Sequence, residues 1–464
     1  MNIPGSMIGR SMGRGGGLRL ADAATTIRHE VAGQRSRTGR ARRLAVCALA
    51  ALVAGAPGRP PRAHADPVVL TVTVNQAISP SRMVLDGRTG HLFVATADNS
   101  RPFSPSWVTM IDLHSGKVLR HTVVGFGLPL LAFDPQLDRV YATGIVQLPA
   151  TGRPSYPRTV PPTVELLVAL DGATGSIVGR AVLGSQSNAP GVDIRLGYLF
   201  VSGGGGRRCT TMTNCSTVAS PVTMLDARTL KVLAVTPVGD SPQDTLVDER
   251  NGRVYVSTID GVDVLDARTD RRLVHIPLQA QVLAVDEAAN RVFLADSSRD
   301  LLLLDGRTSQ VLSILPTPRL LGLGSPGTTL AVDSRMGYLY YAAYPAGGGR
   351  SASSVAMRLY EADGTTGRVV RSCPIGAHPS AVAVARSGLV IVTDYGTNTA
   401  TVIGMAGCVV IRSVRVAPTP LGIAIGMDGT TGVMAIESNT PPGPASSSGN
   451  AALPTSTTVT IASL

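Results

Sequence analysis

Aspartate is the chemically active residue that recurs most regularly in this sequence of 464 residues. Carboxylates can bind cations or transfer protons, but a cation site needs several oxygen ligands that converge on one point. An aspartate in a turn has a simpler role, because its carboxylate accepts hydrogen bonds from backbone N–H groups two or three residues later. One aspartate for each short turn favours this structural role over a metal site. The recurring residues are Asp86, Asp112, Asp134, Asp171, Asp193, Asp226, Asp248, Asp266, Asp286, Asp305, Asp333 and Asp363.

Sequence patterns that carry known catalytic chemistry are absent from the chain. It contains no G-x-S-x-G, no H-E-x-x-H, no Walker loop, no Cys-x-x-Cys and no Cys/His spacing typical of zinc sites. We therefore predict no catalytic residue, no metal and no cofactor. A site assembled from distant parts of the chain would leave no such pattern, so an enzyme stays open as an alternative.

Short strands are the elements that position the aspartates. Residues 246–278 contain four short apolar runs, three of them with period-two alternation, separated by turn sequences. This pattern predicts four antiparallel strands in one small sheet, which cannot bury both of its faces alone. The unit recurs eight times between residues 68 and 464, and the last copy lacks one strand. We predict that residues 68–74 supply this strand and so close a ring.

The second strand of several units, HLFVAT at 91–96, YLFVS at 198–202 and RVYVST at 253–258, resembles the YVTN-type repeat of surface-layer and YncE-like β-propeller proteins. The resemblance covers 68–464. It implies an all-β fold, a single propeller of four-stranded blades closed by pairing of the N-terminal strand with the C-terminal blade. We count eight blades, and seven is the alternative because the family is usually seven-bladed.

The propeller arrangement adds two expectations about cysteine. Cys209 and Cys215 lie in one Gly-rich loop, and we predict a disulfide between them in an exported protein. Cys373 comes near the end of one outer strand and Cys408 at the start of the next. These positions belong to opposite faces of the disc, so we predict that this second pair stays unlinked.

The first 65 residues read as a leader with an export signal. Arginines at 40, 42 and 43 precede an apolar run at 44–56, and an A-x-A sequence at 63–65 predicts cleavage near 65/66. The mature domain would then be 66–464 and extracytoplasmic. Most of the net charge of +11 falls in the leader, so it gives no reason to expect nucleic-acid binding. No later segment has 18 consecutive apolar residues, so we expect no transmembrane span.

Propeller folds host enzymes, binders and scaffolds alike, so the fold does not decide the function. Our first hypothesis is a non-catalytic binding or scaffold protein of the cell envelope or exterior. The alternative is a lactonase-like or streptogramin-lyase-like hydrolase or lyase that works in the axial channel. Arg82, Asp244 and His378 stand at the starts of central strands and would line that channel.

Long connections between the second and third strands of blades one, two, three, six and eight would emerge on one side of the ring. Apart from Asp98 their charges are positive, and they contain aromatic residues typical of interfaces. We predict that the protein, as a monomer, binds an anionic envelope polymer or an acidic protein surface there. The residues assigned to this interface are Arg101, Trp107, Arg153, Tyr156, Arg158, Arg207, Arg208 and Arg350.

Overall fold

Every described segment of the computed structural model belongs to one unit, His64–Leu464, and is built from strands and turns. The described residues are 69–75, 83–97, 103–127, 129–147, 163–183, 188–203, 207–209, 215–217, 220–296, 301–315, 330–343, 357–376, 378–428, 431–440 and 456–464. The predicted export signal and its cleavage site lie outside these residues and stay predictions.

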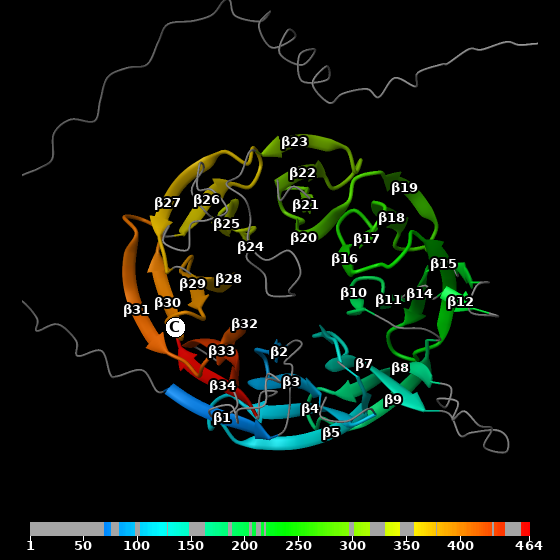
Figure 1. Cartoon of the computed structure of the whole chain (residues 1–464), viewed down its shortest axis with the longest axis horizontal. Helices are drawn as coiled ribbons and strands as arrows, with labels where there is room; N and C mark the ends of the chain where they lie inside the picture. Colours follow the sequence, from blue (N-terminus) through cyan, green and yellow to red (C-terminus); the bar gives the residue numbers. More distant parts are fainter. Residues whose placement is uncertain are drawn as a thin grey trace, which may run out of the picture. The chain divides into compact units, whose positions relative to one another are not determined.

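The first four repeats fold into four antiparallel strands each, numbered here from the centre of the ring outward (Figure 1). Blade 1 consists of β2 (Met83–Asp86), β3 (His91–Ala97), β4 (Pro105–Asp112) and β5 (Val118–Phe126). Blade 2 consists of β6 (Leu131–Asp134), β7 (Arg139–Gln147), β8 (Thr163–Asp171) and β9 (Ile177–Val182). Blade 3 consists of β10 (Gly191–Asp193), β11 (Tyr198–Ser202), β14 (Ser220–Asp226) and β15 (Val232–Val238). Blade 4 consists of β16 (Asp244–Asp248), β17 (Arg253–Ser257), β18 (Val262–Asp266) and β19 (Arg272–Ile276).

The remaining repeats follow the same order. Blade 5 consists of β20 (Ala280–Asp286), β21 (Arg291–Asp296), β22 (Leu301–Asp305) and β23 (Val311–Leu315). Blade 6 consists of β24 (Leu330–Asp333), β25 (Tyr338–Ala343), β26 (Arg358–Asp363) and β27 (Val369–Pro374). Blade 7 consists of β28 (Pro379–Val384), β29 (Val390–Asp394), β30 (Thr399–Gly404) and β31 (Val409–Arg415). Blade 8 consists of β32 (Pro420–Asp428), β33 (Thr431–Thr440), β34 (Ser456–Ser463) and β1 (Val69–Asn75).

The fold is a β-propeller, as the repeats predicted. Blades 1 and 2 are joined into one eight-stranded sheet because the end of β5 pairs with β7 at Phe126 and Ile145. The other blades are separate four-stranded sheets, so the strands form eight repeat units in seven large sheets. Each innermost strand contacts the next, and β32 contacts β2. Apolar side chains fill the space between neighbouring sheets, as where Phe200 of blade 3 packs with Val254 and Val256 of blade 4.

The N-terminal strand completes the last blade, which is the pairing predicted from the sequence. β1 pairs with β34 along its whole length, from Val69 opposite Ala462 to Asn75 opposite Ser456. Its side chains alternate between the two faces: Val72 and Val74 are buried and Thr71 and Thr73 are exposed. The period-two pattern of this segment therefore specifies both the strand and the face that it buries.

The repeated aspartates form turns, as expected. Asp226 is typical of the outer series: its Oδ1 accepts hydrogen bonds from the backbone N–H and the hydroxyl of Thr229, each at 2.7 Å. The pKa of Asp226 is lowered, chiefly because the Thr229 hydroxyl donates to the charged form. The inner aspartates are buried and accept similar bonds, as where Asp134 accepts from the backbone of Gln136 and Leu137. The aspartates explain where the strands end, and they serve as turn residues.

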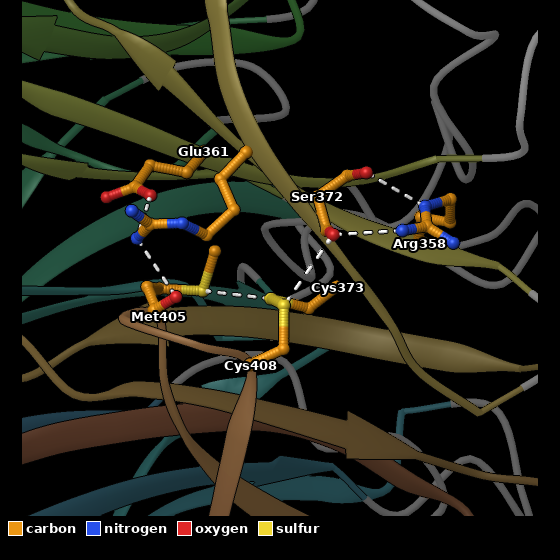
Figure 2. The surroundings of a disulfide bond; sticks show 7 residues. Arg358, Glu361, Ser372, Cys373, Met405 and Cys408 are labelled. Carbon is orange, nitrogen blue, oxygen red and sulfur yellow. Dashed lines mark hydrogen bonds and ion pairs between the residues drawn. A yellow bond between two sulfur atoms is a disulfide. The ribbon is translucent and has the colours of Figure 1, made fainter.

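The expectation that Cys373 and Cys408 stay unlinked is wrong. They form a disulfide with a Cα–Cα distance of 5.4 Å, which joins β27 of blade 6 to the turn before β31 of blade 7 (Figure 2). Beside it, Nη1 of Arg371 pairs with Oε2 of Glu361 at 3.0 Å and donates to the carbonyl oxygen of Met405 at 2.9 Å. Blades 6 and 7 are therefore held together covalently at the rim.

Blade twist explains this error. The prediction treated each blade as flat, with the two ends of an outer strand on opposite faces of the disc. In the structure the outer strands run along the circumference, so the end of β27 reaches the outer turn of the next blade (Figure 1). Sheets twist with a fixed hand, and a β-bulge increases the twist locally. Such a register shift occurs in the outer hairpin of blade 6, between Glu361 and Ala362, and recurs in blades 1 to 5 and 7.

Candidate functional site

Connection lengths divide the ring into two different sides. Because the strands of a blade are antiparallel, the connection from the second to the third strand emerges on the same side as the connection to the next blade. Both tight hairpins emerge on the opposite side, which we call the hairpin side; the first is the loop side. The strand bounds leave long second-to-third connections in the five blades that the sequence indicated. These connections are residues 98–104, 148–162, 203–219, 344–357 and 441–455.

Most residues of the predicted interface fall in these connections but outside the described residues. This holds for Arg101, Arg153, Tyr156, Arg158 and Arg350.

The other three residues assigned to the interface lie on strands. Trp107 is on β4, half-buried and opposite Thr96, so it belongs to the base of the blade 1 connection. Arg207 and Arg208 are on a short strand, β12 (Arg207–Cys209), which pairs with β13 (Cys215–Thr217) within the blade 3 connection. Cys209 lies directly opposite Cys215 in this pairing, and the disulfide between them stays a prediction.

The residues predicted for the axial channel are not brought together as one site. Arg82 lies outside the described residues. Asp244 begins β16, and His378 immediately precedes β28. The inner strands β20 and β24 come between β16 and β28 around the ring (Figure 1). His378 instead stacks on Tyr395 of its own blade, with ring centroids 4.9 Å apart.

One Asp–His pair escaped the sequence analysis. Asp263 on β18 is fully buried; its Oδ1 lies 2.9 Å from Nδ1 of His275 on β19, and its Oδ2 accepts the Gly239 N–H at 2.7 Å. Blade 1 places His121 beside the Thr109 hydroxyl in the corresponding cross-strand position. Recurrence with a different partner, and the use of the carboxylate to fix the backbone at the end of blade 3, favour a structural role. Only the strand register could have revealed it, because the two residues are separated by a turn and a bulge.

Among the described residues, no group of three or more His, Cys, Asp or Glu side chains is placed to hold a metal ion. No helix in the described part of the chain has the length and apolar character needed to cross a membrane.

Asp270 is the described carboxyl that departs furthest from its ordinary chemistry. It lies in the outer turn of blade 4 with a positive φ of 57°, it is fully buried, and neither of its carboxyl oxygens has a hydrogen-bond partner among the described residues. Burial raises the pKa of Asp270 to about 6, and the nearby Thr236 hydroxyl of β15 opposes part of this shift. Blades 3 and 5 place Leu230 and Ser309 in the same turn position, with similar φ angles. Asp270 thus buries an acid where other blades carry a neutral residue.

We expect Asp270→Asn to stabilise the protein at pH 8 by about 3 kcal/mol and to have little effect at pH 3, as measured by denaturant unfolding. The folded-state pKa lies above the unfolded value of 3.8, so between these values folding binds a proton. Stability is therefore lost as pH rises through this window, and above pH 6 the full cost of burying the charge remains. Asparagine removes the charge and tolerates the positive φ.

Asp363→Asn is the matched control for this experiment, because it should change stability in the opposite direction. The Thr366 hydroxyl and N–H lower the pKa of Asp363, so its ionised form stabilises the fold above the unfolded pKa, and this contribution is lost as pH falls through the lowered folded value. Equal effects of the two variants at pH 8 would contradict the assignment.

Comparison with known proteins supports the fold alone. The structure is similar to quinohemoprotein alcohol dehydrogenase from Comamonas testosteroni, with a TM-score of 0.55, 12% identity, and coverage of 85% of this chain and 76% of that one. BamB from Moraxella catarrhalis gives 0.50, 13%, 85% and 97%, and Sqt1 from Saccharomyces cerevisiae gives 0.57, 8%, 84% and 97%. No family model matches the sequence, and no curated protein matches it. Propellers that resemble this chain so distantly differ widely in function, so its own side chains must carry the functional argument.

Proposed function

We propose that this chain is an exported, non-catalytic binding or scaffold propeller of the YVTN-repeat type, which binds an anionic partner through the loop side of the ring. The observation that carries the proposal is that five long connections emerge together there. By sequence they contain six arginines and a single acid, Asp98. Long connections on a rigid scaffold are common recognition elements, and unpaired arginines favour carboxylate or phosphate groups.

The described aromatic residues of blade 1 support a recognition role for this side. Phe103, in the first long connection, has a φ of 64°, which is unusual for a bulky residue. Its ring is largely exposed and packs edge-on against Phe126, with centroids 5.0 Å apart. A strained, exposed aromatic residue held in place by a second ring is typical of a binding surface. An acidic envelope polymer or an acidic protein surface would fit such a mixture of arginine and aromatic side chains.

Replacing Arg153, Arg158, Arg207 and Arg208 by Ser should abolish retention of the protein on isolated envelopes in low salt without changing its melting temperature. The matched control replaces four exposed arginines of the hairpin side, Arg268, Arg307, Arg335 and Arg386, and removes the same charge. Retention of the wild type should weaken as salt is added, because screening weakens exposed charge pairs. Equal loss in both variants would show a nonspecific charge effect and contradict the proposal, as would equal retention of loop-side variant and wild type.

A further inference from the structure

Tyr395 forms an exposed aromatic surface on the loop side of blade 7. It lies in the short turn between β29 and β30, and 48% of its side chain is exposed. One face of its ring lies against the His378 imidazole, tilted by 31°, and its hydroxyl is 3.3 Å from His378 Nδ1. Among the described residues, Phe103 and Tyr395 are the only aromatic side chains with such high exposure. Exposed aromatic surface is therefore scarce in this part of the chain, and blade 7 presents it beside an inner strand.

The turn that carries Tyr395 is held rigidly. The buried Asp394 carboxylate accepts the His378 N–H at 3.0 Å through Oδ2, and through Oδ1 it accepts the N–H and hydroxyl of Thr397 at 2.8 and 3.1 Å. The Tyr395 N–H donates to the His378 carbonyl at 3.0 Å. A Cβ on Gly396 would lie 2.7 Å from Cδ2 of His378, so glycine is required for the two chains to approach this closely. The aromatic pair is thus fixed before any ligand binds, which lowers the entropic cost of binding.

The groups around the ring are polar but uncharged at the surface. The only carboxylate of the turn, Asp394, is buried and bonded to the backbone. Thr397 is exposed, and its hydroxyl also lies 2.8 Å from the hydroxyl of Thr399. The face of an aromatic ring is the negative part of its quadrupole, so it attracts weakly positive C–H groups. A ring of C–H groups rimmed by hydroxyls, as in a pyranose sugar, matches a phenol flanked by threonine hydroxyls.

We propose that Tyr395, supported by His378, is a stacking site for a pyranose ring of a neutral, gluco-configured β-linked glycan. The free face of the phenol contacts the axial C–H groups of the sugar, and the hydroxyls of Thr397 and Thr399 hydrogen-bond to its rim. The site is separate from the arginine-containing connections and does not depend on them. Because no ion pair is involved, binding here should be insensitive to salt.

Calorimetric titration of the full chain with cellohexaose and with chitohexaose tests this proposal. We expect at least one hexaose to bind, equally in low and high salt, and Tyr395→Ala to weaken binding at least about tenfold. Tyr395→Phe should bind within about threefold of the wild type, because it keeps the stacking face. The control is Phe103→Ala, which removes the other exposed aromatic ring and should leave hexaose binding unchanged. Melting temperatures of all variants are compared, so that unfolding is not mistaken for loss of the site.

The proposal is overturned if neither hexaose binds the wild type at about 10 mM, a concentration at which even weak stacking would be detected. It is also overturned if Tyr395→Ala and Phe103→Ala bind as the wild type does. Binding of hexagalacturonate but of neither neutral hexaose would assign an acidic ligand instead and contradict the neutral-site argument. Failure here would leave the envelope-retention experiment unaffected, since that one measures salt-dependent binding through other residues.

Discussion

Replacing both Val72 and Val74 by Asp should abolish cooperative thermal unfolding of the propeller. Both side chains are buried, at 7% and 1% exposure, and pack with Leu92, Ile111 and Val459 at the junction of blades 8 and 1. Losing the burial of two valines costs about 4 kcal/mol, and burying two carboxylates costs more. Because whole domains are stabilised by only about 5–15 kcal/mol, we expect β1 to detach. The unpaired edge of β34 would then favour aggregation, measurable by light scattering alongside calorimetry.

The matched control replaces Thr71 and Thr73, on the exposed face of the same strand, by Asp. This variant carries the same added charge on the same strand but should melt cooperatively, within a few degrees of the wild type. A double Val→Asp variant that unfolds as cooperatively as this control would refute the role of β1 in completing blade 8.

Removing the Cys373–Cys408 disulfide by the double substitution to Ser should lower the free energy of unfolding by about 3–4 kcal/mol. The bridge spans 35 residues of sequence, and a cross-link of that length restricts the unfolded chain strongly. In the folded protein it fixes the junction of two blades, where Arg371 also joins Glu361 to the Met405 carbonyl (Figure 2). Denaturant unfolding measures the change, and mass spectrometry of unreduced peptides tests the linkage directly.

The corresponding Cys209→Ser, Cys215→Ser variant is the comparison, because any bridge there would close a much shorter segment within one connection. We expect a smaller loss of stability and no loosening between blades. If the two double variants lost stability equally, or if reductant left the unfolding of the wild type unchanged, the blade 6 to blade 7 cross-link would be wrong.

The sequence by itself determined the repeat unit, its strands and the closure of the ring. Alternating segments such as Thr71–Val74 specify a half-buried strand locally, and aspartate turns such as that of Asp226 end the strands through bonds to residues three positions away. The missing strand of the last repeat left an unpaired edge, and β1 was the segment with the right pattern to fill it. These features depend on neighbours in the chain or on simple pairing, so composition and spacing were sufficient.

Tertiary structure alone decided which residues of different blades meet. Cys373 met Cys408 because the twist of blade 6 carries the end of its outer strand around the rim, a displacement that summed over a whole sheet and left no local pattern. The stacking of His378 on Tyr395 and the burial of Asp270 likewise depend on packing between turns that are distant from one another or belong to different blades. Strand periodicity records which face is buried. It does not record what lies opposite that face, and in a ring of similar blades this is where functional differences arise.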